Sequence, residues 1–156
     1  SIATWNVNSV RLRFPLIEKF VAAHAPDVLC LQETKCPDEL FPRKDFARLG
    51  YEHAALHGQK GWHGVAILSK RPFADISRDS YCGKSDARHV AVQLDHRAGI
   101  SKPVTIHNFY IPAGGATIGV AGTFTIKFCR LTSFQSRSAS AMVALVSIVC
   151  HRCRYQ

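Results

Sequence analysis

Residues 1–31 alternate between strand-type and helix-type patterns, and this alternation limits the fold more than any other feature of the chain. Residues 2–7 are a short apolar run typical of a β-strand, and Asn8 or Ser9 can cap a helix after it. Apolar side chains then recur at helical spacing: Leu12, Leu16, Ile17, Phe20 and Val21. The Ala25-Pro26 step ends that helix, because proline lacks an amide proton, and residues 27–31 form a second apolar run. The order strand, helix, strand predicts an α/β fold with a βαβ-like start.

Strand patterns dominate the sequence after this start. Residues 36–49 indicate a loop and a short helix, with Gly50 as the C-terminal stop. The strands expected next share flanking loops rich in Gly, Lys, His and Asp: residues 51–56, 64–69, 89–94 and 103–110. We therefore expect an α/β chain whose later strands are mostly antiparallel.

Charge is distributed unevenly along the chain, whose formal net charge is +9. Residues 1–115 contain 15 Lys and Arg against 11 Asp and Glu, whereas residues 116–156 contain 5 basic residues and no acidic one. The first part is thus only mildly basic. This charge is compatible with a polyanionic partner such as DNA, and an ordinary basic surface accounts for it equally well.

The six cysteines show no framework spacing, and Cys30 lies in an apolar strand. Without a signal peptide, this pattern argues against a secreted disulfide scaffold and favours a reducing cytoplasm. Cys150 and Cys153 have the spacing of half a zinc site, but a second pair is missing, so we expect no zinc. The apolar run 141–150 is about half of the roughly 20 residues that span a bilayer, so we expect no membrane segment.

Glu33 is the strongest single candidate for a functional residue, because it directly follows the apolar run 28–31. A carboxylate at a strand end can bind a hard cation such as Mg²⁺, which keeps several waters. Taken alone, a glutamate after a strand is usually a solvated loop residue. Asn6 and Asn8, taken alone, could likewise be structural, since asparagine in a turn commonly bonds its own backbone.

Tyr110 and Asn108 fall on one face of the predicted strand 103–110, since side chains alternate along a strand. A tyrosine there either packs in the core with a bonded hydroxyl, or directs its phenol at a phosphate on which charge builds up. In the loop 57–64, Trp62 lies among evenly spaced glycines, which alone indicate only a flexible hairpin.

Three short strings occur together in a fixed order: Ala3-Thr4-Trp5-Asn6-Val7-Asn8-Ser9-Val10-Arg11, Leu31-Gln32-Glu33-Thr34-Lys35 and His107-Asn108-Phe109-Tyr110-Ile111-Pro112. As a set they resemble the first half of the exodeoxyribonuclease III type of apurinic/apyrimidinic endonuclease, within the endonuclease/exonuclease/phosphatase family. The resemblance covers residues 1–115, whereas residues 116–156 form an unrecognised tail. It implies the first half of a four-layer α/β sandwich.

The resemblance implies a role for each candidate residue. Glu33 becomes the ligand of Mg²⁺, with Mn²⁺ as an alternative ion, and Asn6 organises the metal and the acidic groups. Asn8 stands where some relatives carry an acid. Tyr110 contacts the scissile phosphate, and Asn108 lies on the same strand face. The residues expected to contact DNA are cations and one loop aromatic: Arg11, Lys35, Trp62 and Arg88.

The remaining catalytic groups of the family are missing from this sequence. They are an Asp-x-Asn pair, a further Asp and a terminal Ser-Asp-His, yet the last acidic residue here is Asp95. We expect residues 116–156 to be out-of-frame translation or a misassembled gene, with a genuine C-terminal segment as the alternative. The two family halves pack their sheets face to face, so we also expect the inward residues of a lone half to lose their cover: Leu29, Leu31, Ile67 and Val92.

Three classes of function remain open. The first is a Mg²⁺-dependent DNA repair nuclease that cleaves double-stranded DNA beside abasic sites and trims 3′ ends, located in a bacterial-type cytoplasm at the nucleoid. We expect this activity by descent and expect the truncated chain itself to be inactive. The second is another phosphoesterase of the same superfamily, and the third is a non-catalytic fragment that binds nucleic acid through charge.

Overall fold

The computed structural model describes residues 1–80, 85–95, 104–112, 127–129 and 142–150, and at residue 112 and in the last two segments it describes the backbone pairing only. The strands are β1 (Ile2–Asn6), β2 (Val28–Gln32), β3 (His53–His57), β4 (Val65–Ser69), β5 (Phe73–Ser77), β6 (His89–Leu94), β7 (Val104–Pro112), β8 (Lys127–Cys129) and β9 (Met142–Cys150). The helices are α1 (Val10–His24), the short 3₁₀ helix η1 (Asp38–Leu40) and α2 (Arg43–Arg48).

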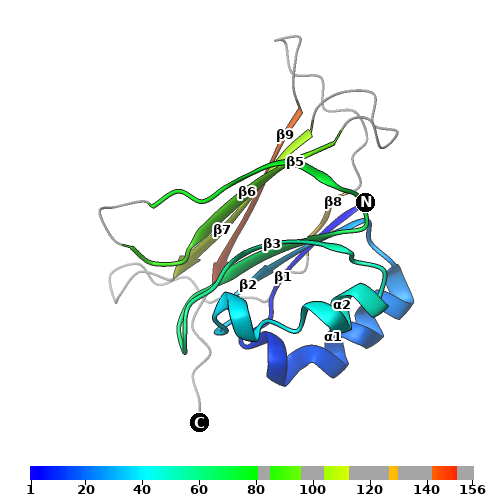
Figure 1. Ribbon diagram of the computed structural model, residues 1–156, viewed down its shortest axis with the longest axis horizontal. Helices are drawn as coiled ribbons and strands as arrows, with labels where there is room; N and C mark the ends of the chain where they lie inside the picture. The colour runs from blue at the N-terminus through cyan, green and yellow to red at the C-terminus, as the bar shows by residue number, and fades with distance from the viewer. Residues whose placement is uncertain (81–84, 96–103, 113–126, 130–141, 151–156) are drawn as a thin grey trace.

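The strands form two sheets that lie over one another. The first has the order β3-β4-β2-β1-β8 and the second the order β5-β6-β7-β9. Helices α1 and α2 cover one face of the first sheet, and the second sheet lies over its other face (Figure 1). Strands β1 and β2 are parallel and joined by α1, whereas β2–β4, β3–β4, β5–β6 and β6–β7 are antiparallel. The predicted α/β fold with mostly antiparallel later strands is confirmed.

Helix α1 begins and ends where its sequence predicts. The Ser9 side chain accepts a hydrogen bond from the Leu12 amide, and Ala25 closes the helix in the left-handed conformation with φ 42°. Its buried residues are Val10, Ile17 and Val21, which share one stripe of the helix. Leu12 and Leu16, expected on the apolar face, lie on another side and are 69% and 47% exposed.

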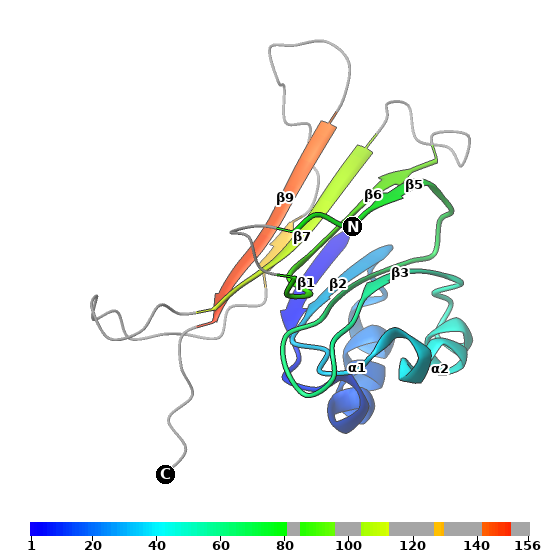
Figure 2. The same cartoon turned by 60° about the vertical axis from the view of Figure 1, so that its left-hand side comes forward.

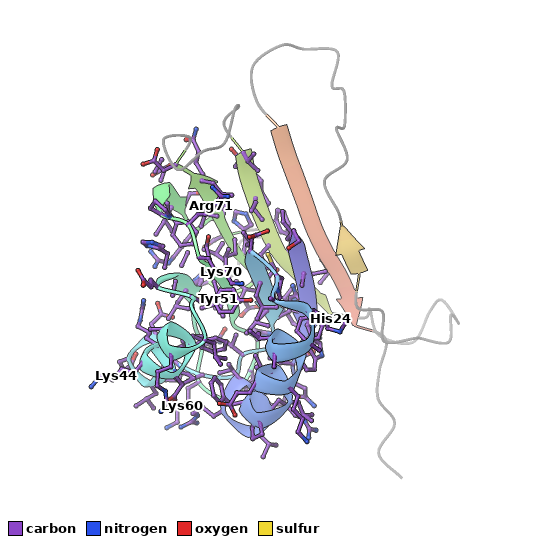
Figure 3. The ribbon with its side chains drawn as sticks, turned by 90° about the vertical axis from the view of Figure 1, so that its right-hand side faces the viewer. His24, Lys44, Tyr51, Lys60, Lys70 and Arg71 are labelled. Carbon is purple, nitrogen blue, oxygen red and sulfur yellow. The ribbon has the colours of Figure 1, made fainter. Side chains whose placement is uncertain are left out.

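Two side chains that flank strands of the first sheet bind the chain directly after α1. The Tyr51 hydroxyl donates to the carbonyl of Pro26 at 2.8 Å, and Lys70 Nζ donates to the carbonyl of Ala25 at 3.0 Å. The same ammonium lies 5.5 Å from the centre of the Tyr51 ring, and Figure 3 shows the two side chains together. These bonds satisfy the carbonyls of the C-cap residue Ala25 and of Pro26, which follows it.

Apolar side chains fill the space on both faces of the first sheet. One core lies beneath the helices and includes Leu29 and Leu31, and a second lies between the sheets and includes Ile67 and Val92. All four are at most 1% exposed. The expectation that these residues lose their cover is therefore wrong, because β5, β6 and β7 of this chain already form a facing sheet. That sheet includes β5, which the sequence pattern did not predict because its mixed residues show no clear alternation.

Two segments of the predicted tail extend the sheets. Strand β8 pairs antiparallel with β1, and β9 pairs in parallel with β7 over nine positions, so the two sheets gain one strand each (Figure 2). Residues 151–153 of the half zinc pattern lie outside the described residues. In the described part of the chain, no helix is long and apolar enough to cross a membrane.

A histidine pair links β6 to β7. His89 is fully buried, and its Nε2 lies 3.1 Å from Nδ1 of His107. The backbone amide of Asp79 donates to His89 Nδ1 at 3.2 Å, so that nitrogen acts as the acceptor and Nε2 carries the proton. The pKa of His89 is lowered by burial, and the charges of His107 and His57 add to this against the opposing effect of Asp79.

We predict that this histidine makes the fold less stable as the pH falls below about 6.5, the ordinary histidine pKa. The unfolded chain takes up the proton first, because the native pKa is lower, so the free energy of unfolding decreases between the unfolded and the native pKa. Urea unfolding from pH 7.5 to 5 measures this slope. The His89→Gln variant should show a shallower slope than the parent, and an identical slope would contradict the assignment.

Candidate active site

The predicted functional residues gather at one edge of the two sheets. Asn6 and Gln32 are the last residues of the parallel strands β1 and β2, so their following loops leave the sheet side by side. Backbone hydrogen bonds join these loops: the Ser9 amide donates to the Glu33 carbonyl at 2.7 Å, and the Lys35 amide donates to the His63 carbonyl at 3.0 Å. The loop after β1, the loop after β2 and the segment around His63 are thus bonded together into one rigid edge.

Unusual backbone conformations concentrate at this edge. Asn8, Ser9, Glu33, Lys35 and His63 all have positive φ, and among the described non-glycine residues only one other, Ala25 at the end of α1, does so. Such conformations cost on the order of 1–3 kcal/mol each and gather at functional sites. Gly64 (φ +86°) belongs to the same edge, where a Cβ atom would lie 2.2 Å from Thr34 Oγ1. The backbone strain in these loops indicates a functional site at this edge.

The Glu33 carboxylate is the centre of the site. It is 9% exposed, and Asn6 Nδ2 donates to its Oε1 at 2.9 Å. The Lys35 ammonium lies 3.2 Å from its Oε2. Burial raises the pKa of Glu33, but the hydrogen bonds from Asn6, Lys35 and Tyr110 and the charge of Lys35 outweigh this and lower it. The carboxylate is therefore ionised and fixed in place at neutral pH.

Asn8 acts on the other side of Lys35. Its Oδ1 accepts a hydrogen bond from Lys35 Nζ at 2.5 Å, and its amide donates to Asn6 Oδ1 at 3.2 Å. Asn6, Asn8, Glu33 and Lys35 therefore form one connected network.

Tyr110 approaches the same carboxylate from the second sheet. Its hydrogen bond to Glu33 lowers the pKa of that group, and its backbone amide donates to the Arg88 carbonyl at 2.8 Å. The Arg88 guanidinium lies 6.0 Å from the Tyr110 ring centre and donates to Asp86 Oδ2 at 2.8 Å. The edge thus combines two carboxylates, one phenol and two cations.

Asn108 lies beneath the site and is fully buried. Its Nδ2 donates to the carbonyls of Leu31 and Ala66, both at 2.9 Å, and its Oδ1 accepts from Gln32 Nε2 at 2.6 Å. Both amide protons and the oxygen are therefore engaged in joining the two sheets. Asn108 supports the loop that carries Glu33 and presents no unused amide proton to a ligand.

The two remaining candidates are exposed at the surface. Arg11 lies in the first turn of α1, where its charge acts on the nearby Cys36 thiol. Trp62 is 70% exposed, between Gly61 and His63, which both have positive φ. Neither residue is part of the bonded network around Glu33. Both are placed where a large ligand could reach them.

His63 and Asp86 also belong to this edge, although the sequence did not single them out. His63 Nε2 lies 3.4 Å from Arg88 Nη2 and 3.9 Å from Asp86 Oδ2, and its ring centre lies 5.5 Å from that of Tyr110. Burial lowers the pKa of His63, the Arg88 charge adds to this, and Asp86 opposes it. The only sequence signal for His63 was its place in the glycine loop.

Glu33 is a suitable ligand for a hard divalent cation. Its ionised oxygens lie at a polar loop edge, and Mg²⁺ needs only one or two carboxylates when water and phosphate complete its shell. Among the described residues, no group of three or more His, Cys, Asp or Glu side chains could hold a metal by itself. Among the described cysteine side chains, Cys30 and Cys36 are free thiols.

This chain belongs to the endonuclease/exonuclease/phosphatase family, whose model matches residues 3–146. It is 37% identical over 113 residues to exodeoxyribonuclease III of Haemophilus influenzae, covering 71% of this chain and 41% of that protein. It is 32% identical over 117 residues to a DNA-(apurinic or apyrimidinic site) endonuclease of Dictyostelium discoideum, covering 73% of this chain and 30% of that protein.

Solved structures agree with this assignment. An AP endonuclease from Archaeoglobus fulgidus is 37% identical with a TM-score of 0.61, over 71% of this chain and 40% of that one. The 3′ phosphatase NExo from Neisseria, bound to a product DNA hairpin, is 31% identical with a TM-score of 0.58, over 67% of this chain and 39% of that one. The predicted resemblance is confirmed, and the chain spans about two fifths of the length of these structures.

Proposed function

We propose that residues 1–112 carry the metal- and phosphate-binding half of a DNA repair nuclease of the exodeoxyribonuclease III type. The observation that supports this most strongly is the buried, ionised Glu33 carboxylate, bonded to Asn6 and Lys35 and reached by Tyr110. The reaction is hydrolysis of a DNA phosphodiester beside an abasic site or at a 3′ end. The partner is double-stranded DNA.

Each residue of the network has a distinct part in this proposal. Glu33 holds Mg²⁺, or Mn²⁺ in its place, and Asn6 fixes the orientation of the carboxylate. When bound, the ion polarises the phosphate and offsets its charge. Tyr110 donates a hydrogen bond to the oxygen on which charge develops. Lys35, Arg11 and Arg88 contact the phosphate backbone, which positions DNA without reading its sequence.

The exposed loop that carries Trp62 favours DNA over a small phosphoester. Gly61 and His63, both with positive φ, flank Trp62 in a bend that leaves the indole 70% exposed, so the ring is available to stack on a base or a sugar edge.

We predict no measurable cleavage of an abasic-site duplex by the chain as written. Hydrolysis needs a group that orients and deprotonates the attacking water, and the other described carboxylate of this edge, Asp86, is already ion-paired with Arg88. The assay compares the purified chain with and without Mg²⁺. Glu33→Gln and Tyr110→Phe variants, purified in parallel, control for host nuclease. Robust Mg²⁺-dependent incision that disappears in both variants would overturn this prediction.

The composition of this edge also supports a second function, that of a non-catalytic fragment that binds nucleic acid. The cations at the edge are retained even though the groups that would activate water are not recognisable. Complementation of a nuclease-deficient cell by residues 1–112 joined to the C-terminal part of Haemophilus influenzae exodeoxyribonuclease III separates the two. Rescue requires a complete catalytic site, whereas a fragment that only binds leaves the cell sensitive to abasic damage.

A further inference from the structure

Arg88 is held more tightly than a surface cation that contacts phosphate requires. Its guanidinium donates to Asp86 at 2.8 Å, approaches His63 Nε2 at 3.4 Å and lies over the Tyr110 ring. The arginine is only about a third exposed on its side chain, at 31%. An exposed arginine keeps most of its rotamer freedom, which binding must then remove. Here the folded chain has already removed much of it.

His63 is the side chain that contacts both the Arg88 guanidinium and the Tyr110 ring. One edge of its ring faces the guanidinium, and the ring itself is tilted by 40° against Tyr110, with 5.5 Å between centres. Arginine offers only donors, so the contact with Nε2 requires a neutral imidazole whose Nε2 accepts. The Asp86 oxygen would favour the opposite state, but it is farther away at 3.9 Å. The shorter contact decides in favour of the neutral ring.

The backbone holds His63 in place for this role. The His63 carbonyl accepts from the Lys35 amide, the Gly64 amide donates to the Ala87 carbonyl at 2.9 Å, and the Ala87 amide donates to Gln59 Oε1 at 3.1 Å. The loop is thus bonded to the Glu33 loop on one side and to the Arg88 segment on the other. The strained φ of 50° at His63 is maintained by these bonds.

We propose that His63, together with Asp86, is a positioning residue that fixes Arg88 and Tyr110 relative to Glu33, so that the arginine meets a DNA phosphate in a preformed geometry. The inference rests on the proposed function for its use of DNA, whereas the ordering of Arg88 by His63 is independent of it. A direct phosphate contact by His63 is the competing explanation. The two differ in whether the effect of His63 depends on Arg88.

The first measurement follows the Arg88 side chain in the full chain without DNA. ¹⁵N relaxation of its Nε–Hε group should show a rigid side chain in the parent and a mobile one in His63→Ala. The His63→Gln variant keeps an acceptor and should restore part of the order. His53→Ala is the matched control, because His53 lies at the opposite end of the first sheet, where it pairs with Ser69. An Arg88 signal that is unchanged in His63→Ala, with the fold intact, overturns the proposal.

The second measurement is a double-mutant cycle on the affinity for a short DNA duplex. His63→Ala should weaken binding about fivefold in the parent and less than about 1.5-fold in the Arg88→Ala background, because coupled residues are not additive. Equal losses in both backgrounds mean that His63 acts directly, which contradicts positioning. If Arg88→Ala leaves the affinity unchanged, the DNA contact of the proposed function fails, while the relaxation result still decides whether His63 orders Arg88.

Discussion

Replacing Glu33 with glutamine is expected to lower Mg²⁺-dependent DNA cleavage by roughly three orders of magnitude, because a bound metal supplies several kcal/mol of transition-state stabilisation. Glutamine keeps the shape and one acceptor oxygen but removes the charge that holds the ion. DNA affinity should change little, since phosphate contacts from Arg11 and Arg88 remain. The substitution therefore separates the chemical step from binding.

The measurement needs a catalytically complete protein. A chimera of residues 1–112 with the C-terminal part of Haemophilus influenzae exodeoxyribonuclease III supplies it, since the two chains are 37% identical over the shared 113 residues. Glu52→Gln is the matched control, because Glu52 is exposed and precedes β3 at the sheet end remote from Glu33. Equal cleavage by the parent chimera and the Glu33→Gln chimera would remove Glu33 from the metal role.

The same carboxylate shows how far the sequence could predict the site. Asn6 ends β1 and Glu33 directly follows the parallel neighbour β2, so their proximity follows from the βαβ start alone. Tyr110 was placed with them by a motif, and the structure does bring the three together. The histidine at position 63 could not be found in this way, because its role depends on Arg88, directly before β6, and on the Tyr110 ring of β7, which local patterns do not relate to the loop.

The fold was predictable to a similar extent. Apolar runs and their stops placed α1 and most strands within one to three residues. Burial was predicted less well: Leu12 and Leu16 fit a helical spacing but point away from the stripe formed by Val10, Ile17 and Val21. The facing sheet was missed because strand partners are set by long-range pairing, such as β6 with β7, which the order of apolar residues does not specify.

Asn108 joins the sheets beneath the site, and its replacement by leucine is expected to lower the free energy of unfolding by about 3–5 kcal/mol. The substitution leaves the carbonyls of Leu31 and Ala66 buried without the side-chain donor they now have, and it removes one acceptor from Gln32. Each buried polar group deprived of a partner costs about 1–3 kcal/mol. Ordinary domains are stable by only about 5–15 kcal/mol, so the loss is large.

Urea unfolding of the parent, Asn108→Leu, Gln32→Leu and the double variant measures this effect. Thr105→Val is the control on the same strand, with an expected change within about 0.5 kcal/mol. Because Gln32 Nε2 and Asn108 Oδ1 share a 2.6 Å hydrogen bond, each single variant includes the loss of that bond, and the double variant loses it once. The double variant should therefore be more stable than the sum of the single losses predicts. Strictly additive losses, or an Asn108→Leu variant as stable as the control, would show that the buried amide does not hold the two sheets together.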